Sequence, residues 1–103
     1  MIPLGVKTTA VLQRIFAPED QSQAISMLEG GCGDNLPDYG SGMYQLERVR
    51  FAALKLSLGN LHKLSEAIKL AQMDWRDLLV GADFAESVQE HEDWAAKMLG
   101  AAS

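Results

Sequence analysis

The amino-acid sequence predicts an all-α fold, a compact bundle of five or six helices with a Gly-rich loop near residues 30–43. Within residues 44–80, apolar residues recur at helical spacing, and residues that favour helix ends stand at the breaks in this pattern. The loop holds five of the nine glycines, which is typical of a connection between helices. Alternation of apolar and polar residues never extends beyond a few positions, so no strand is expected.

Two helices are expected before this loop. Residues 6–16 place their apolar side chains approximately on one face, and Pro18 ends that stretch and suits the first turn of a new helix. Glu19 and Asp20 follow, where a helix amino terminus favours negative charge. The glycine pair at 30–31 is expected to stop this second helix.

The helix that starts at Tyr44 is expected to be the central one, because it is apolar over much of its circumference. Arg48 and Lys55 lie seven positions apart, share a face, and are expected to form a narrow solvent-exposed strip. The apolar residues of this helix are Leu46, Val49, Phe51, Ala52, Ala53, Leu54 and Leu56.

Three more helices are expected after it. Gly59 can end the central helix in the left-handed conformation, and Asn60 can cap the next one, which runs to Ala71. Asp74 is expected to cap a short helix that ends at Gly81. A last helix is expected to begin at a capping Asp83, and its apolar stripe comprises Phe84, Val88, His91, Ala95 and Met98.

Length and composition indicate one ordinary globular domain over residues 1–103, with 48% hydrophobic and 22% charged residues. The net charge of −5 disfavours general binding to nucleic acids or anionic membranes, because both partners attract basic surfaces. The middle third is mildly basic between two acidic ends.

The single cysteine, Cys32, excludes an internal disulfide and a metal site built from several thiolates. The first residues lack the basic head and apolar run of a signal peptide. No stretch approaches the roughly 18 apolar residues of a membrane span. These features predict a cytoplasmic protein without membrane association.

No catalytic, cofactor or metal site is predicted. Asp34 and Asp38 lie near Cys32 and would raise its pKa, while His62 and His91 are distant in sequence, so a plain loop or core cysteine is favoured over a nucleophile. The loop lacks the Lys-Ser/Thr of a phosphate-binding loop and the ligand spacing of a calcium loop. A cysteine-dependent enzyme is therefore the third of three interpretations.

The second interpretation is DNA binding by a helix-turn-helix arrangement over residues 53–80, with its third helix beginning at Trp75. That helix offers Arg76 beside Asp77, then Leu-Leu-Val, which is poor in groups that contact bases or phosphates. The cations available to such a site are Arg48, Lys55, Lys63 and Arg76.

Three segments stand out: ERVRFAALKLS at residues 47–57, DWRDLLV at 74–80 and CGDNLP at 32–37. They resemble segments of a family of small uncharacterised bacterial proteins, over most of residues 15–85. The matching positions are largely expected core and capping residues, so the resemblance implies a shared fold and a bacterial cytoplasmic protein. It implies no function to carry over.

The first interpretation, reached by subtraction, is a non-enzymatic intracellular module that recognises another protein or a second copy of itself. Its expected partner-binding residues are Arg48, Lys55, Trp75 and Arg76. Aromatic residues and arginine are the residue types enriched at protein interfaces. A nucleic-acid partner is disfavoured, and no cofactor is expected.

Overall fold

The computed structural model of the chain describes residues 3–33, 43–87 and 89–100, and these residues form five helices and no strand. The helices are α1 (Val6–Ile15), α2 (Pro18–Gly31), α3 (Met43–Ser57), α4 (Leu61–Gly81) and α5 (Gln89–Met98). The predicted all-α class is confirmed. Most of the Gly-rich loop, residues 34–42, lies outside the described residues.

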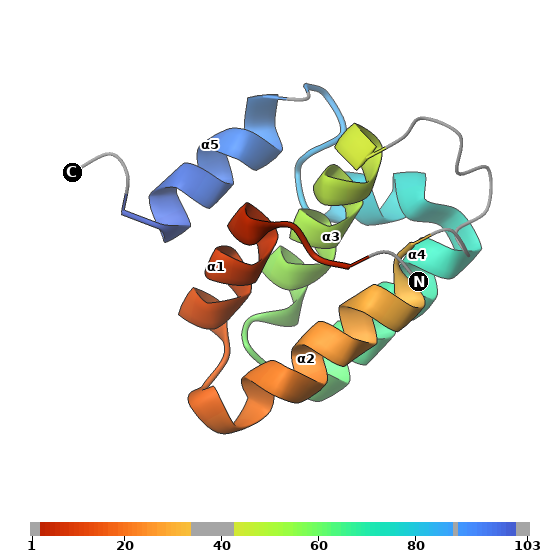
Figure 1. Ribbon diagram of the computed structural model, residues 1–103. Helices are drawn as coiled ribbons and strands as arrows, with labels where there is room; N and C mark the ends of the chain where they lie inside the picture. Colours follow the sequence, from red (N-terminus) through yellow and green to blue (C-terminus); the bar gives the residue numbers. More distant parts are fainter. Residues whose placement is uncertain (1–2, 34–42, 88, 101–103) are drawn as a thin grey trace.

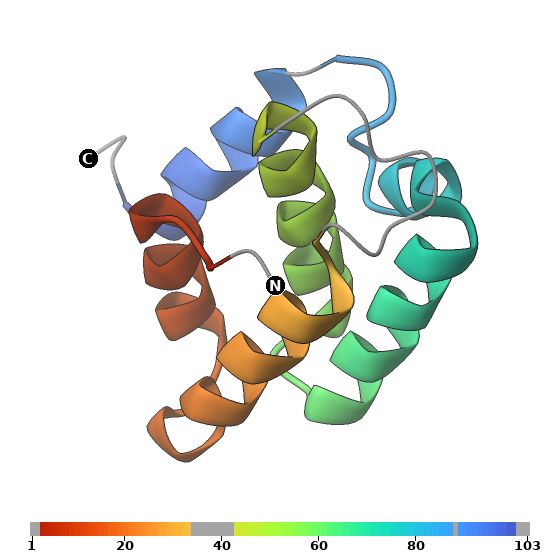
Figure 2. The same cartoon turned by 45° about the vertical axis from the view of Figure 1, so that its right-hand side comes forward.

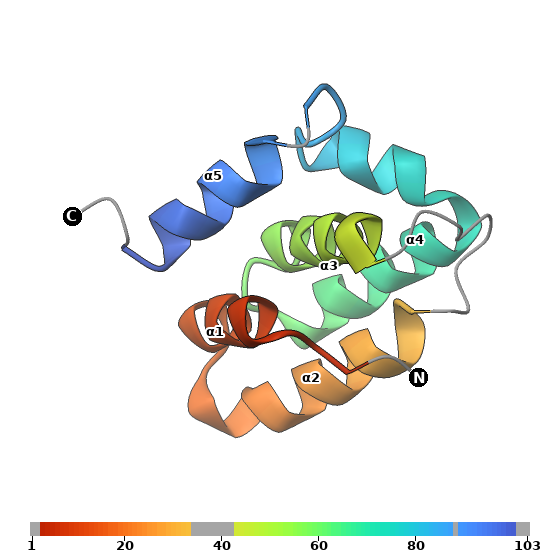
Figure 3. The same cartoon turned by 45° about the horizontal axis from the view of Figure 1, so that its top comes forward.

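α3 lies at the centre of the bundle (Figure 1). It contacts α4 most extensively and also contacts α1 and α5, while α2 packs on α1 and α4. Figure 2 shows α4 running beside α3, with α1 on the opposite side of α3. Figure 3 shows α3 between α5 above and α1 below it.

The central position of α3 follows from its apolar surface. Leu54 is fully buried, Leu56 is half-buried, and the other predicted apolar residues of α3 belong to the core. This helix is therefore covered on several sides, as its sequence predicts. The expected solvent-exposed strip is wrong, however, because Arg48 is only 8% exposed. Its long side chain reaches the backbone that follows α4 and is buried there.

The connection between α3 and α4 uses two consecutive residues with positive φ, Leu58 (52°) and Gly59 (78°). Glycine is required at position 59, because a Cβ there would approach the carbonyl oxygen of Ile15 to 2.6 Å. The side chain of Asn60 then accepts a hydrogen bond from the backbone N–H of Lys63 at 2.9 Å, which confirms the predicted cap.

The predicted short helix after Asp74 is the last part of α4. Asp74 has non-helical torsion angles (φ −161°, ψ 95°), so α4 bends there. Its carboxylate accepts a hydrogen bond from the backbone N–H of Arg76 at 3.1 Å. Asp74 thus caps the second segment of α4, as predicted, and α4 consists of two helical segments that meet at a kink.

The predicted start of the last helix at Asp83 is wrong. Asp83 has a φ of 63°, and α5 begins only at Gln89. The N–H of Ser87 donates to the carboxylate of Glu90 at 3.0 Å, and the N–H of Gln89 donates to the Ser87 hydroxyl at 3.1 Å. Ser87 therefore caps α5 through the N–H of Gln89, while the Glu90 side chain accepts from the Ser87 N–H, as in one half of a capping box.

In the parts of the chain that the structure describes, no helix is both long enough and apolar enough to span a membrane.

Candidate functional site

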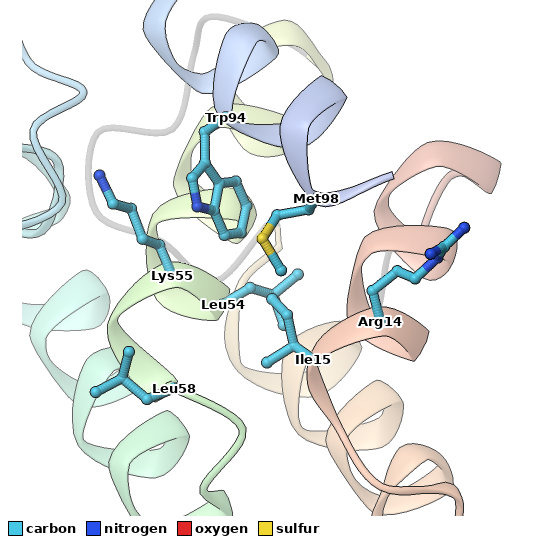
Figure 4. Close-up of a pocket in the computed structure, with 7 residues that line it drawn as sticks. All are labelled: Arg14, Ile15, Leu54, Lys55, Leu58, Trp94 and Met98. Carbon is cyan, nitrogen blue, oxygen red and sulfur yellow. The ribbon is translucent and has the colours of Figure 1, made fainter. Parts of the chain in front are cut away.

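A pocket of about 450 Å³ opens between α1, α3 and α5 (Figure 4). Apolar side chains form most of its wall, and the figure shows those of Ile15, Leu54 and Met98 grouped together beside the ring of Trp94. The lining residues are Arg14, Ile15, Leu54, Lys55, Leu58, Trp94 and Met98. Three helices that are distant in sequence therefore build one concave apolar surface.

The wall from α5 is held by aromatic contacts. The Trp94 ring lies 6.0 Å from the Phe51 ring at an interplanar angle of 60°, and 5.8 Å from the Phe84 ring at 57°. Such tilted arrangements stabilise aromatic pairs beyond their buried area. Leu54, fully buried, supplies the wall from α3. These contacts give the pocket a preformed shape.

Leu58 forms part of the rim and is an unusual residue for its position. Its side chain is 74% exposed, and its φ of 52° places it in the left-handed region. That conformation costs a residue other than glycine about 1–2 kcal/mol, and exposure leaves most of its apolar surface in water. Folding alone would favour asparagine or glycine here, so Leu58 is a candidate functional residue.

Two cations flank the apolar residues. Arg14 is exposed and lies in the last turn of α1, and Lys55 is half-buried in the last turn of α3. Figure 4 shows their side chains extending away from the grouped apolar side chains in different directions. Among residues 3–33, 43–87 and 89–100, no carboxylate forms an ion pair with either cation.

The four predicted partner-binding residues are brought together as two pairs. Arg48 donates from Nε and Nη2 to the carbonyl oxygen of Phe84, with the Nε contact at 3.1 Å. Lys55 donates from Nζ to the carbonyl oxygen of Ala82 at 2.8 Å and lies 5.0 Å from the centre of the Phe84 ring. Both cations thus bind the backbone after α4, and of the four residues only Lys55 lines the pocket.

Trp75 and Arg76 form the second pair, just after the bend in α4. The Arg76 guanidinium lies 5.4 Å from the centre of the half-buried Trp75 ring. Asp74 and Asp77, both exposed, flank them in sequence. In this part of α4, Arg76 is the cation available to phosphates, and it is stacked on an aromatic ring between two acids. This arrangement is poor for DNA binding.

Cys32 is fully buried, so of the loop and core positions that the sequence left open, the structure shows the core one. Burial raises the pKa of the Cys32 thiol to about 12, although the nearby charge of Arg50 opposes this effect. Because the thiolate is the nucleophilic form, a thiol of this kind is inert at neutral pH. The interpretation as a cysteine-dependent enzyme gains no support.

The two histidines lie apart. His91 is buried between the rings of Phe51 and Phe84, at centroid distances of 5.6 and 6.3 Å. His62 is exposed, 3.7 Å from the carboxylate of Glu66. Over the described ranges of the chain, no group of three or more His, Cys, Asp and Glu residues could hold a metal ion.

Sequence patterns alone missed most of the pocket. Ile15 belongs to the apolar face of residues 6–16 and Met98 to the apolar stripe of the last predicted helix, so neither was distinguished from a core residue. The sequence contained one usable signal for the pocket. Leu58 directly precedes the glycine that ends α3, so an apolar residue stands at a turn, where its side chain is exposed to solvent.

Comparisons with protein-family models, curated proteins and solved structures found no match to this chain. The resemblance of residues 47–57 and 74–80 to small bacterial proteins therefore stays a prediction.

Proposed function

We propose that this chain is a non-enzymatic protein-interaction module, and that a partner protein inserts an apolar side chain into the pocket between α1, α3 and α5. The observation that carries this proposal is Leu58, an exposed leucine held in an unfavourable backbone conformation at the pocket rim. A residue that stabilises neither the backbone nor the core is best explained by a contact made with another molecule.

The composition of the pocket supports the same function. Trp94, Met98 and Leu58 are residues of different flexibility around one apolar concavity, and methionine in particular adapts to varied apolar surfaces. Apolar pockets with a polar margin are typical places for the anchoring side chain of a partner. We place this function in the cytoplasm, where an unpaired cysteine such as Cys32 is ordinary.

The proposal is tested with a library of random 12-residue peptides displayed on phage and selected against the purified chain. Selected peptides should share at least one large apolar residue, and their binding should fall more than tenfold in Leu58→Asn. Asparagine tolerates the left-handed conformation, so this variant removes the apolar contact without disturbing the fold.

Val6→Asn is the matched control. Val6 is 92% exposed but does not line the pocket, so this variant should bind the selected peptides like the wild type. Peptides that bind the wild type and Leu58→Asn equally, or a selection that yields no binding peptide, would overturn the proposed function.

DNA binding by the segment after Asp74 remains the second proposal, motivated by the bend that separates two helical segments. A titration with random duplex DNA at increasing salt distinguishes it, since phosphate contacts make affinity fall steeply with salt. Weak binding at low salt, unaffected by Arg76→Gln, would remove this alternative.

A further inference from the structure

We infer that the partner segment is an acidic peptide, whose large apolar side chain enters the pocket while its carboxylates pair with Arg14 and Lys55. This inference rests on the proposed function and adds the chemistry of the partner. It is carried by the distribution of charge around the pocket.

The charge of the pocket is opposite to that of the chain. The whole sequence has a net charge of −5, yet among the described residues the charged ones that line the pocket are Arg14 and Lys55, and none of those residues that line it is acidic. The helix that contributes Arg14, α1, also contains Lys7 and no acidic residue. α5, which contributes Trp94 and Met98, carries Glu90, Glu92 and Asp93 against Lys97, but none of these four lines the pocket. The two cations at the margin of the pocket favour a partner that carries carboxylates and fix its orientation.

Both cations retain the capacity to bind a carboxylate. Within the described part of the chain, the Arg14 guanidinium has no hydrogen bond or ion pair, and Arg14 is exposed. The Lys55 ammonium donates to the carbonyl oxygen of Ala82. A carbonyl is neutral and uses one of three N–H donors, so the positive charge persists and two donors remain.

The pocket volume limits the size of the occupant. At about 450 Å³, the pocket lies in the lower half of the range of roughly 300–1,000 Å³ found for small-molecule sites. It also opens to solvent beside the exposed Leu58. One or two apolar side chains of a peptide fit this shape, with the peptide backbone outside and its carboxylates near the two cations.

Other anionic partners fit less well. An anionic membrane or a nucleic acid attracts surfaces with several clustered Lys and Arg residues, whereas this pocket has two. A second copy of the chain could offer the acidic first turn of α5, which contains Glu90 and Glu92. Two chains that each carry a net charge of −5 repel each other more strongly at long range than one such chain repels a short peptide with a few carboxylates, so a segment of a different protein is favoured.

The test uses the same 12-residue peptide selection, with the charge of each selected peptide as the readout. Against the wild type, selected peptides should carry a net negative charge beside their large apolar residue. Against Arg14→Glu, the negative bias should disappear. For one selected acidic peptide, Arg14→Gln should weaken binding roughly threefold to fivefold, as expected for one exposed ion pair. Arg14→Lys should restore most of the affinity, and Lys69→Gln, an exposed cation of α4 outside the pocket, should have no effect.

The outcomes separate the two proposals. Selected peptides that depend on Leu58 but show no negative bias would refute the acidic partner and leave the proposed function in place. Absence of any Leu58-dependent peptide would refute both. The oligomeric state of the chain alone is measured by sedimentation at increasing concentration. A dimer that the Arg14→Glu variant no longer forms would refute the acidic peptide and identify a second copy of the chain as the occupant of the pocket.

Discussion

At the residue scale, Leu58 is unfavourable in two respects. Its backbone lies in the left-handed region, and its apolar side chain is exposed to solvent. Leu58→Asn places a residue that tolerates positive φ at this position and removes an exposed apolar group. We expect the free energy of unfolding to rise by about 0.5–1 kcal/mol, as for other changes that relieve an unfavourable backbone position. Urea denaturation measures the change. A gain in stability with a loss of peptide binding is the combination expected where a residue is kept for function.

Leu58→Ala is the control for this prediction. It shortens the side chain but keeps a Cβ in the left-handed conformation, so the strain persists. Its stability should stay within about 0.5 kcal/mol of the wild type, as for ordinary surface changes. A marked loss of stability in both variants would show that Leu58 packs within the fold.

Cys32 gives a second prediction at this scale. With a pKa of about 12, its thiol is almost entirely protonated at pH 8, and it is also buried. Alkylation by iodoacetamide in the native state should be more than tenfold slower than that of a free small thiol, whose pKa is about 8.5. In urea the two rates should converge. Rapid native labelling at mildly acidic pH would restore the cysteine-dependent enzyme as a hypothesis.

The sequence predicts the burial of some single residues better than that of others. For Cys32 the sequence left a loop and a core position open, and the structure shows the core position, where unpaired cysteines are commonly found. The burial of Arg48 could not be predicted, because its partner is the carbonyl of Phe84, thirty-six positions away. A basic residue on a helix reads as exposed unless that distant carbonyl is known to lie beside it.

At the element scale, Lys55 links α3 to the end of α4. The Lys55 ammonium binds the carbonyl of Ala82, which the helical ladder of α4 leaves without a donor, and it lies over the Phe84 ring. Lys55→Met keeps an unbranched stem and removes the charge. We expect it to lower the free energy of unfolding by about 1 kcal/mol, the size typical of a partly exposed hydrogen bond.

Thermal denaturation at constant pH measures the loss of stability expected for Lys55→Met. Lys69→Met on α4 is the control, and its free energy of unfolding should stay within about 0.5 kcal/mol of the wild type. Equal effects of the two variants would mean that the contact with Ala82 contributes nothing. Lys55 is then both a structural contact and, by our inference, a binding residue, so Arg14 remains the cleaner variant for binding experiments.

Helix boundaries were predictable where the signal is local. Asn60 caps α4 and Asp74 caps its second segment, since each side chain binds a backbone N–H only two or three residues ahead. The predicted start of α5 was too early because the apolar pattern begins at Phe84. This residue is buried although it precedes the first residue of α5 in the sequence. The spacing of Ser87 and Glu90 was the better signal, because the hydrogen bonds that these two side chains accept depend on the local sequence alone.

At the scale of the whole molecule, sequence predicted the class and the central helix but not the pocket. The periodicity of α3 showed that it must be covered on several sides. Which helices cover it depends on contacts between distant segments, such as Ile15 and Met98 beside Leu54. A pocket is a place where such packing is incomplete, so the pattern of any one helix cannot reveal it.

The pH dependence of folding is the last prediction, and it concerns the packing of α5 on the rest of the bundle. His91 anchors α5 among the rings of Phe51 and Phe84. Burial lowers the pKa of His91 below its ordinary value, and the positive charges of Arg48 and Lys7 add to this. The negative charges of Glu92 and Glu47 act in the opposite direction, with Glu47 3.9 Å from the ring.

Because the pKa of His91 is lower in the folded than in the unfolded chain, the unfolded chain binds the proton first as the pH falls. The contribution of His91 to the free energy of unfolding should therefore be fully present above about pH 6.5. It should decrease as the pH falls below that value, and the decrease should stop below the lowered pKa of the folded chain. Urea denaturation between pH 8 and pH 5 measures this slope, which for one histidine is at most about 1.4 kcal/mol per pH unit. His91→Gln should flatten the slope, whereas His62→Gln should not, since His62 is exposed. If His91→Gln keeps the full slope, groups other than His91 cause it, and α5 is not held by a neutral histidine.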